Sequence, residues 1–307
     1  MVNSTLLKKL ITPIGSLIAL ISLLFVGQQL VENWNKVGVY KLTLESAGVL
    51  FLGSIGYACS CFFLSSAWYQ ILNSLCTEKL SFGSLRSIYA RSQIAKYIPG
   101  NVMQIAGRHI MINRLGVSHK PLAMASLTEI LGLLSASCTI TIIGSAVFGL
   151  GVDYINLEQF YNGLVFIALL LFLIPFIRKV SVKFFPSSRK FLENTRLQWA
   201  FFFAYLKYLL FFIFAGSILL GLVYYLSGPV KLYDISAIIA TFAISWLAGF
   251  ITPGAPSGIG IRETILIMSL DNILLGSSSA LIAILFRIVT IGGDILFFSI
   301  AGRKKLK

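Results

Sequence analysis

Long apolar runs alternate along the chain with short polar or interrupted segments. A hydrocarbon core of about 30 Å is crossed by roughly 20 residues of α-helix, so runs of this length predict transmembrane helices. The pattern therefore predicts an all-α polytopic integral membrane protein with about six full spans, in one transmembrane domain over residues 1–307. The predicted spans are 10–28, 45–74, 121–150, 157–177, 198–227 and 279–301.

Composition supports the membrane class, because 57% apolar and only 12% charged residues lie outside the range of soluble domains. A net charge of +14 would suggest a nucleic-acid partner for a soluble protein, but in a membrane protein the placement of the charges matters more. We therefore expect no nucleic acid. The four cysteines form no metal-type pair, and His109 and His119 have no acidic neighbours, so neither metal nor cofactor is expected.

The cations gather on alternate segments of the chain. Nineteen of the 25 lysines and arginines lie in the N-terminus, the 75–120 stretch, the 178–196 loop and the tail "RKKLK". The positive-inside rule places both termini and both basic loops in the cytoplasm. Alternation of the spans then requires segment 234–275 to enter and leave on the outer side, which predicts a re-entrant hairpin.

Two Pro-Gly breaks interrupt the apolar pattern at equivalent places. Segment 99–108 reads "PGNVMQIAGR" and segment 253–262 reads "PGAPSGIGIR", with an arginine at the same offset from the proline and a glycine just before it. Each break lies between two long spans, and the charge pattern opens the first hairpin to the cytoplasm and the second to the outside. This arrangement predicts an inverted-topology repeat of 45–150 and 198–301.

Paired breaks of this kind meet near the membrane midplane in secondary transporters, where half-helix N-termini favour anions. Non-helical backbone is tolerated at that depth only where it is buried in protein or lines a wet cavity. We therefore expect Arg108 and Arg262 to converge on one cavity. The alternative is that each Pro-Gly forms a surface loop whose arginine lies among lipid headgroups.

The segments "RSQIAKYIPGNVMQIAGR" and "PGAPSGIGIRE" resemble the two signature segments of the lysylphosphatidylglycerol synthetase transmembrane family. That family includes the flippase half of the bacterial multiple peptide resistance factor, and stand-alone members near polysaccharide and glycolipid genes. The resemblance covers about 45–300 and implies a lipid headgroup site in a bacterial plasma (inner) membrane. The residues implied are Arg91, Lys96, Pro99, Gly100, Asn101, Gln104, Gly107 and Arg108 for one wall, and Pro253, Gly254, Gly258, Gly260, Arg262 and Glu263 for the other.

The chain also departs from the family pattern. The second motif of the family often reads Pro-Gly-Gly-Leu-Gly, whereas Ala255, Pro256 and Ser257 occupy the comparable turn here, which leaves the headgroup open. The soluble aminoacyl-transferase domain of the bifunctional relatives is absent from these 307 residues. Synthesis of an aminoacyl lipid is therefore not implied.

Charged side chains within predicted spans are further candidates, because each costs about 2.5–3.5 kcal/mol at a helix centre. Glu129 lies eight residues into its span, while Arg287 and Asp294 are seven residues apart and share one face of the last span. We expect these groups to form ion pairs or to couple transport to protons. The pairings left open are Arg108 with Glu263 and Arg262 with Glu129. A further alternative is that Arg287 and Asp294 are a structural ion pair between helices.

Transport of an anionic lipid or lipid-linked substrate, in envelope lipid or polysaccharide biogenesis, is the function this pattern favours. Arginine and lysine beside helix N-termini suit phosphate, whether of a phospholipid or of a polyprenyl-phosphate-linked glycan. No nucleotide-binding loop is present, so ATP is not the direct energy source. The alternatives are an integral-membrane transferase on a lipid-linked sugar, or a non-transporting assembly partner of such envelope enzymes. Because the predicted outer loops offer only scattered carboxylates, we expect a transporter rather than an enzyme.

Overall fold

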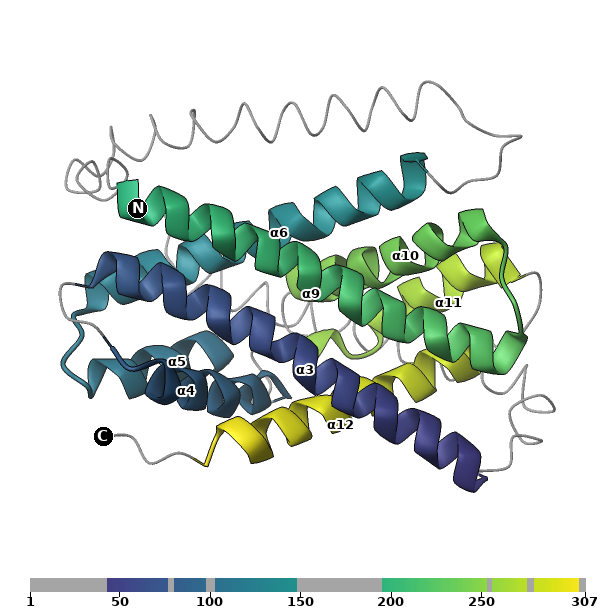
Figure 1. Ribbon diagram of the computed structural model, residues 1–307, viewed down its shortest axis with the longest axis horizontal. Coiled ribbons are helices and arrows are strands. Elements are labelled where there is room, and N and C mark those ends of the chain that lie inside the picture. Colours follow the sequence, from purple (N-terminus) through teal and green to yellow (C-terminus); the bar gives the residue numbers. More distant parts are fainter. Residues whose placement is uncertain are drawn as a thin grey trace, which may run out of the picture.

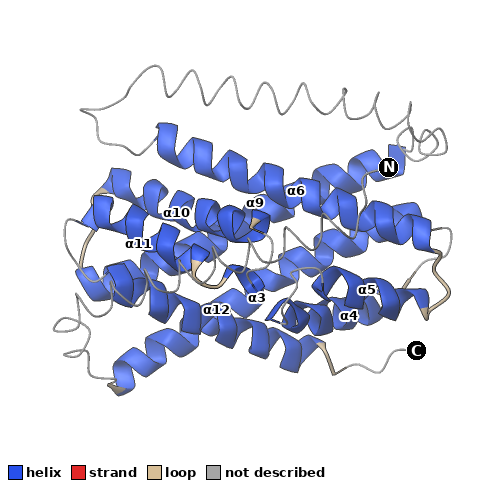
Figure 2. Ribbon diagram, turned by 180° about the vertical axis from the view of Figure 1, so that it is seen from behind, coloured by secondary structure: helices blue, strands red, loops and turns tan. Residues whose placement is uncertain are grey.

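The computed structural model confirms the all-α class. Helices are its regular elements, and no strand occurs in the described part of the chain (Figure 2). The predicted spans 10–28 and 157–177 lie outside the described residues. The structure describes residues 43–76, 80–97, 103–147, 195–252, 256–274 and 279–303.

Five of the described helices are long and apolar enough to cross a membrane, so the chain is a membrane protein with several spans. The long helices are α3 (Leu44–Leu75), α6 (His119–Val147), α9 (Thr195–Ser227), α10 (Leu232–Ile251) and α12 (Ser279–Ala301). The shorter elements are α4 (Phe82–Ile94), η1 (Ala95–Tyr97), α5 (Met103–Asn113), η3 (Pro256–Gly258) and α11 (Ile261–Leu274).

Four predicted spans coincide with α3, α6, α9 and α12 to within a few residues. The fifth apolar helix, α10, occupies a segment for which the charge pattern predicts one arm of a re-entrant hairpin. Its 20 residues are long enough to cross the membrane unaided. Figure 1 nevertheless shows α10 and α11 folding back on each other, with their outer ends at the same end of the molecule.

Two broken helical hairpins enter the bundle from opposite ends. The α4–α5 hairpin comes from one end and the α10–α11 hairpin from the other, and their breaks, η1 and η3, are in contact inside the molecule (Figure 1). In both halves a long helix precedes the hairpin and another follows it. The assignment of 45–150 and 198–301 as inverted repeats stays a prediction.

Small residues allow the long helices to approach closely, as is usual inside membranes. A β-carbon added to Gly293 of α12 would lie 2.7 Å from the Tyr57 ring of α3. One added to Gly144 of α6 would lie 2.6 Å from the β-carbon of Ala240 in α10. The helices that surround the two breaks are therefore held at short distances.

The charged residues near the helix ends differ between the two ends of the molecule. The end of α3, the α5–α6 turn, the start of α9 and the end of α12 lie together at one end of the molecule (Figure 1). The cations in these segments include Arg114, Lys120, Arg196 and Arg303. The opposite end includes Lys231 together with the carboxylates Glu45, Asp234 and Asp271. That the basic end faces the cytoplasm stays a prediction.

This sidedness can be tested by labelling single cysteines with a membrane-impermeant maleimide in a cysteine-free background. Gly116→Cys, in the α5–α6 turn, should react only from the cytoplasmic side, whereas Lys231→Cys, before α10, should react only from outside. The reason is that cations are retained in the cytoplasm during insertion. Labelling of both positions from the same side would contradict the hairpin topology, and the reverse pattern would contradict the orientation.

Candidate functional site

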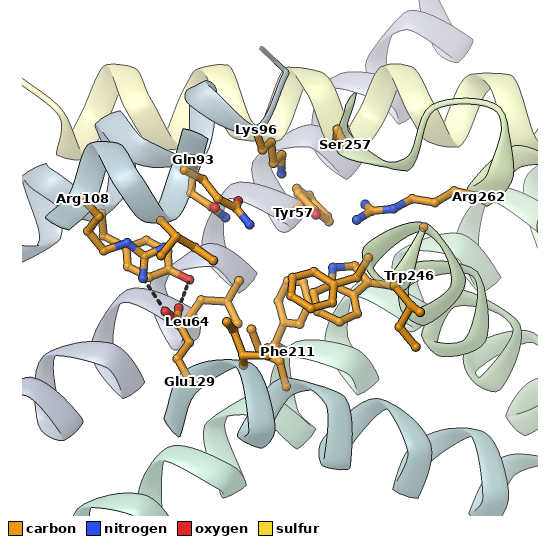
Figure 3. A pocket seen from close by; sticks show the side chains of 18 residues that line it. Tyr57, Leu64, Gln93, Lys96, Arg108, Glu129, Phe211, Trp246, Ser257 and Arg262 are labelled. Carbon is orange, nitrogen blue, oxygen red and sulfur yellow. Dashed lines mark hydrogen bonds and ion pairs between the residues drawn. The ribbon is translucent and has the colours of Figure 1, made fainter. Parts of the chain in front are cut away.

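A cavity of about 300 Å³ lies where the two hairpin breaks meet. Helices α3, α6 and α9 and both hairpins contribute to its walls, which are largely apolar. In Figure 3, Arg108 and Arg262 lie on opposite sides of it, which confirms the predicted convergence of these two arginines. The polar side chains that line it are Tyr57, Tyr89, Gln93, Lys96, Gln104, Arg108, Glu129, Ser257 and Arg262.

Arg108 of α5 is buried, and its donors are engaged by protein groups. Its Nη1 donates to Glu129 of α6 at 2.5 Å, and its Nε donates to the Ser92 hydroxyl at 3.2 Å. The rings of Trp68 and Tyr89 have their centres 4.8 and 4.1 Å from the guanidinium carbon, in cation–π contact. The Tyr89 hydroxyl also donates to Glu129 at 2.9 Å. The charge of Arg108 is therefore compensated within the protein.

The pairings left open from the sequence for Arg108 and Arg262 are both wrong. Arg108 pairs with Glu129, and in the described part of the chain Arg262 forms no ion pair with Glu129. Glu129 faces the first hairpin, whereas Arg262 reaches the cavity from the second. Glu263 instead accepts from the Gly260 N–H and pairs with Arg287 of α12.

Asp294 of α12 is fully buried and ties the first hairpin to the long helices. Its Oδ2 accepts from Lys96 Nζ at 2.6 Å and from the Tyr97 hydroxyl at 2.6 Å, both in η1. The Cys61 thiol of α3 lies 3.9 Å from Oδ1. The break of the first hairpin is thus fixed to α12 and approached by α3.

Glu263 and Arg287 tie the second hairpin to the same helix. Glu263 is the third residue of α11 and accepts from the Gly260 N–H at 2.7 Å, as in one half of a capping box. Its other oxygen lies 3.4 Å from Arg287 Nε, and Arg287 Nη1 donates to the Ser257 carbonyl at 3.4 Å. The ion pair of Arg287 with Asp294 that the sequence left open is therefore wrong: each residue belongs to a separate ion pair with another element, one for each hairpin.

Arg262 differs from the other cations of the cavity. Among the lining residues that the structure describes, it is the cation without a carboxylate partner, and its Nε is buried without a hydrogen bond. Its guanidinium carbon lies 5.8 Å from the Trp246 ring centre. In Figure 3 it extends toward Tyr57 and the middle of the cavity. This geometry leaves Arg262 able to bind an anion.

Two glycines form the slot through which the Arg262 side chain passes. A β-carbon at Gly249 of α10 would lie 2.6 Å from Arg262 Cγ, and one at Gly258 would lie 2.9 Å from Arg262 Nε. Gly258 also has a φ of 67°, in the left-handed region that favours glycine. Larger residues at either position would displace the guanidinium from the cavity.

Several neutral side chains at the cavity, among them Tyr57, form no hydrogen bond with a described residue. The Ser257 hydroxyl is buried and unpartnered. The Gln93 and Gln104 amides line the cavity, and neither amide forms a hydrogen bond with a described residue. An unsatisfied buried polar group is destabilising by about 1–3 kcal/mol, so the Ser257 hydroxyl is poised for a bound polar partner, and the two amides are free to bind one.

The predicted headgroup residues divide into three groups. Lys96, Gln104, Arg108 and Arg262 line the cavity, as does Glu129, which was selected for its charge within a span. A second group is absent from the lining: Gly107, Gly258, Gly260, Glu263 and Arg91. Of these, Gly258, Gly260 and Glu263 shape the turn before α11. Arg91 donates to the Gly302 carbonyl at 2.9 Å, at the end of α12. Pro99, Gly100, Asn101, Pro253 and Gly254 lie outside the described residues.

Several lining residues escaped the sequence analysis because they belong to ordinary helical runs. Gln93 stands inside the quoted first motif but carries no charge. Trp246 and Gly249 are three residues apart, so they share a face of α10 just before the second break. That spacing next to a Pro-Gly break is the signal that would have indicated them.

Comparison of the chain with protein-family models gives no match, and no curated protein matches it. The family resemblance carried by the two motifs therefore stays a prediction. No group of three or more histidines, cysteines or acids that could hold a metal occurs among the described residues. The function must accordingly be argued from the cavity and its charges.

The Arg108–Glu129 pair predicts non-additive losses of stability. Glu129→Gln should lower the midpoint temperature of thermal unfolding strongly, because breaking a buried pair leaves an uncompensated charge and costs about 3–5 kcal/mol. Arg108→Gln combined with Glu129→Gln should lower it by less than the sum of the two single changes. Glu45→Gln, at the exposed start of α3, is the matched control and should have little effect. Strictly additive changes would show that the pair is not coupled.

Proposed function

We propose that the chain is a membrane transporter of the flippase type for an anionic lipid or lipid-linked substrate. The observation that carries the proposal is Arg262, an unpaired cation in a cavity among membrane-spanning helices. A cation in low-dielectric surroundings is unfavourable unless an acceptor compensates it. An anionic headgroup would be that acceptor.

The position of the cavity suits alternating access. The two hairpins enter from opposite ends of the molecule (Figure 1), and residues of both line the cavity. Movement of one hairpin at a time would open the cavity to alternate sides, as in transporters built around a site between broken helices. The ion pairs to α12 would then act as the contacts that close each side.

The charges at the cavity favour transport over a transferase reaction. Glu129, the carboxylate among the described lining residues, is paired with Arg108 and so is not a free base for group transfer. Glu263 and Asp294 are likewise held by cations, which supports structural roles for these acids. The unpaired group is a cation, as expected of a site that binds rather than deprotonates its substrate.

The setting that we propose is the bacterial plasma membrane, with both termini cytoplasmic. The sorting of cations to one end of the bundle supports this orientation. The two Pro-Gly motifs support a role in envelope lipid or polysaccharide biogenesis, because they resemble the transmembrane domains of lipid flippases. The partners would be a phospholipid or polyprenyl-phosphate-linked glycan and the enzymes that make or use it.

Arg262→Ala should reduce translocation of a labelled lipid in proteoliposomes to the level of protein-free vesicles, because it removes the cation that compensates the headgroup. Arg262→Lys should restore only part of the rate, since an ammonium keeps the charge but loses the planar two-point contact. Arg114→Ala, which changes an exposed cation in the α5–α6 turn, should leave the rate unchanged.

Expression and thermal unfolding of each variant would separate transport from folding. The two lipids to be compared are a fluorescent phosphatidylglycerol and a polyprenyl phosphosugar. The translocation of each is measured with a reagent that quenches or modifies only the lipid in the outer leaflet. A wild-type rate in folded Arg262→Ala protein, for whichever lipid the wild type moves, would contradict the proposed function.

A further inference from the structure

The cavity and its ion-pair partners carry one net positive charge. Three cations pair with carboxylates at 2.5–3.4 Å, which leaves Arg262 uncompensated. Excess charge of either sign is unfavourable where water is largely excluded. The bound group that balances the site therefore carries a single negative charge. The described groups counted are Lys96, Arg108, Arg262 and Arg287 against Glu129, Glu263 and Asp294.

Three buried donors without hydrogen bonds lie around the second break. Arg262 Nε and the Ser257 hydroxyl are both buried without hydrogen bonds, five residues apart in the chain. Nη2 of Arg287, whose Nη1 contacts the Ser257 carbonyl, is also buried and unpartnered. A phosphodiester has two non-bridging oxygens that share one charge, and a guanidinium donates to both while a hydroxyl adds a third bond.

The first hairpin presents different chemistry to the same cavity. Gln93 of α4 and Gln104 of α5 offer amides, which donate and accept hydrogen bonds and carry no charge. Hydroxyl groups have the same dual character. Since neither amide is engaged by a described residue, this side suits a hydroxylated group next to the phosphate.

From these observations we infer that the cavity selects a monoanionic phosphodiester whose second ester bears a hydroxylated group. The phosphate binds Arg262 and Ser257, and the hydroxyls bind Gln93 and Gln104. The inference rests on the proposed function for the lipid nature of the substrate. A glycerophospholipid with a glycerol headgroup and a polyprenyl-phosphate-linked sugar both present this chemistry, whereas a polyprenyl diphosphate carries too much charge.

The test is equilibrium binding to the purified full-length protein in detergent, measured by native mass spectrometry. The phosphodiester probes are short-chain phosphatidylglycerol and a polyprenyl phosphosugar; the comparison probes are short-chain phosphatidic acid, polyprenyl diphosphate and decanoate. At least one phosphodiester should bind tenfold or more tightly than every comparison probe, and the tighter of the two identifies the source. Arg262→Gln should abolish this preference.

Two further variants keep the test independent of whether Arg262→Gln folds. Ser257→Gly removes the hydroxyl and suits the left-handed backbone at this position, where φ is 51°, and it should weaken phosphodiester binding severalfold. Gln104→Lys adds a second uncompensated cation to the site, on the wall opposite Arg262, without breaking an ion pair. It should move the preference toward the diphosphate. Leu131→Gln, on the exposed face of α6, is the control and should change neither affinity.

Tighter binding of the diphosphate or of decanoate than of both phosphodiesters to wild-type protein would overturn the inference. The inference would also be overturned if Gln104→Lys protein bound the phosphodiesters and the diphosphate with the same relative affinities as the wild type. Failure of the two proposals can be told apart. Selective phosphodiester binding without translocation would support this inference and contradict the proposed transport function. Arg262-dependent translocation of a diphosphate-linked lipid would support the transport function and overturn this inference.

Discussion

Compensation of buried cations is the constraint on which this structure depends. A guanidinium or ammonium among membrane-spanning helices needs an acceptor close by, because hydrocarbon cannot solvate it. Three ion pairs meet this need within the described protein, and each joins separate elements: α5 to α6, η1 to α12, and α11 to α12. The breaks of both hairpins are thus anchored to one long helix. Among the described cations that line the cavity, Arg262 is the one without a carboxylate partner, and the proposed site follows from it.

The backbone around Arg262 is arranged to deliver this one side chain. Pro-Gly breaks are tolerated inside a bundle only where surrounding protein buries them. Here η3 contacts α10 and η1, and Arg287 of α12 donates to the Ser257 carbonyl. Gly249 and Gly258 leave no β-carbon in the path of the guanidinium. Glu263, which follows Arg262 directly, caps α11 instead of neutralising its neighbour. Local capping and close packing therefore maintain an uncompensated charge at the cavity.

The sequence predicts those features that depend on the length of apolar runs and on the Pro-Gly breaks that interrupt them. Runs of about 20 apolar residues predict α3, α6, α9 and α12, and the matched Pro-Gly segments predict that Arg108 and Arg262 share a cavity. Ion-pair partners could not be predicted, because they depend on the depth and rotation of helices far apart in the chain. The Arg108–Glu129 pair is an example, since Glu129 could face either hairpin until the packing of α6 was known. Gln93 was missed although it stands inside the first motif, because a neutral side chain before the break carries no charge to mark it.

The most direct test of the central claim is a cryo-electron microscopy structure of the protein in nanodiscs that contain the phosphodiester lipid it binds. The account predicts phosphate density within hydrogen-bonding distance of the Arg262 guanidinium, between the two breaks, with Arg108 still paired to Glu129. A structure in which a protein carboxylate compensates Arg262 and the lipid phosphate lies elsewhere would contradict it.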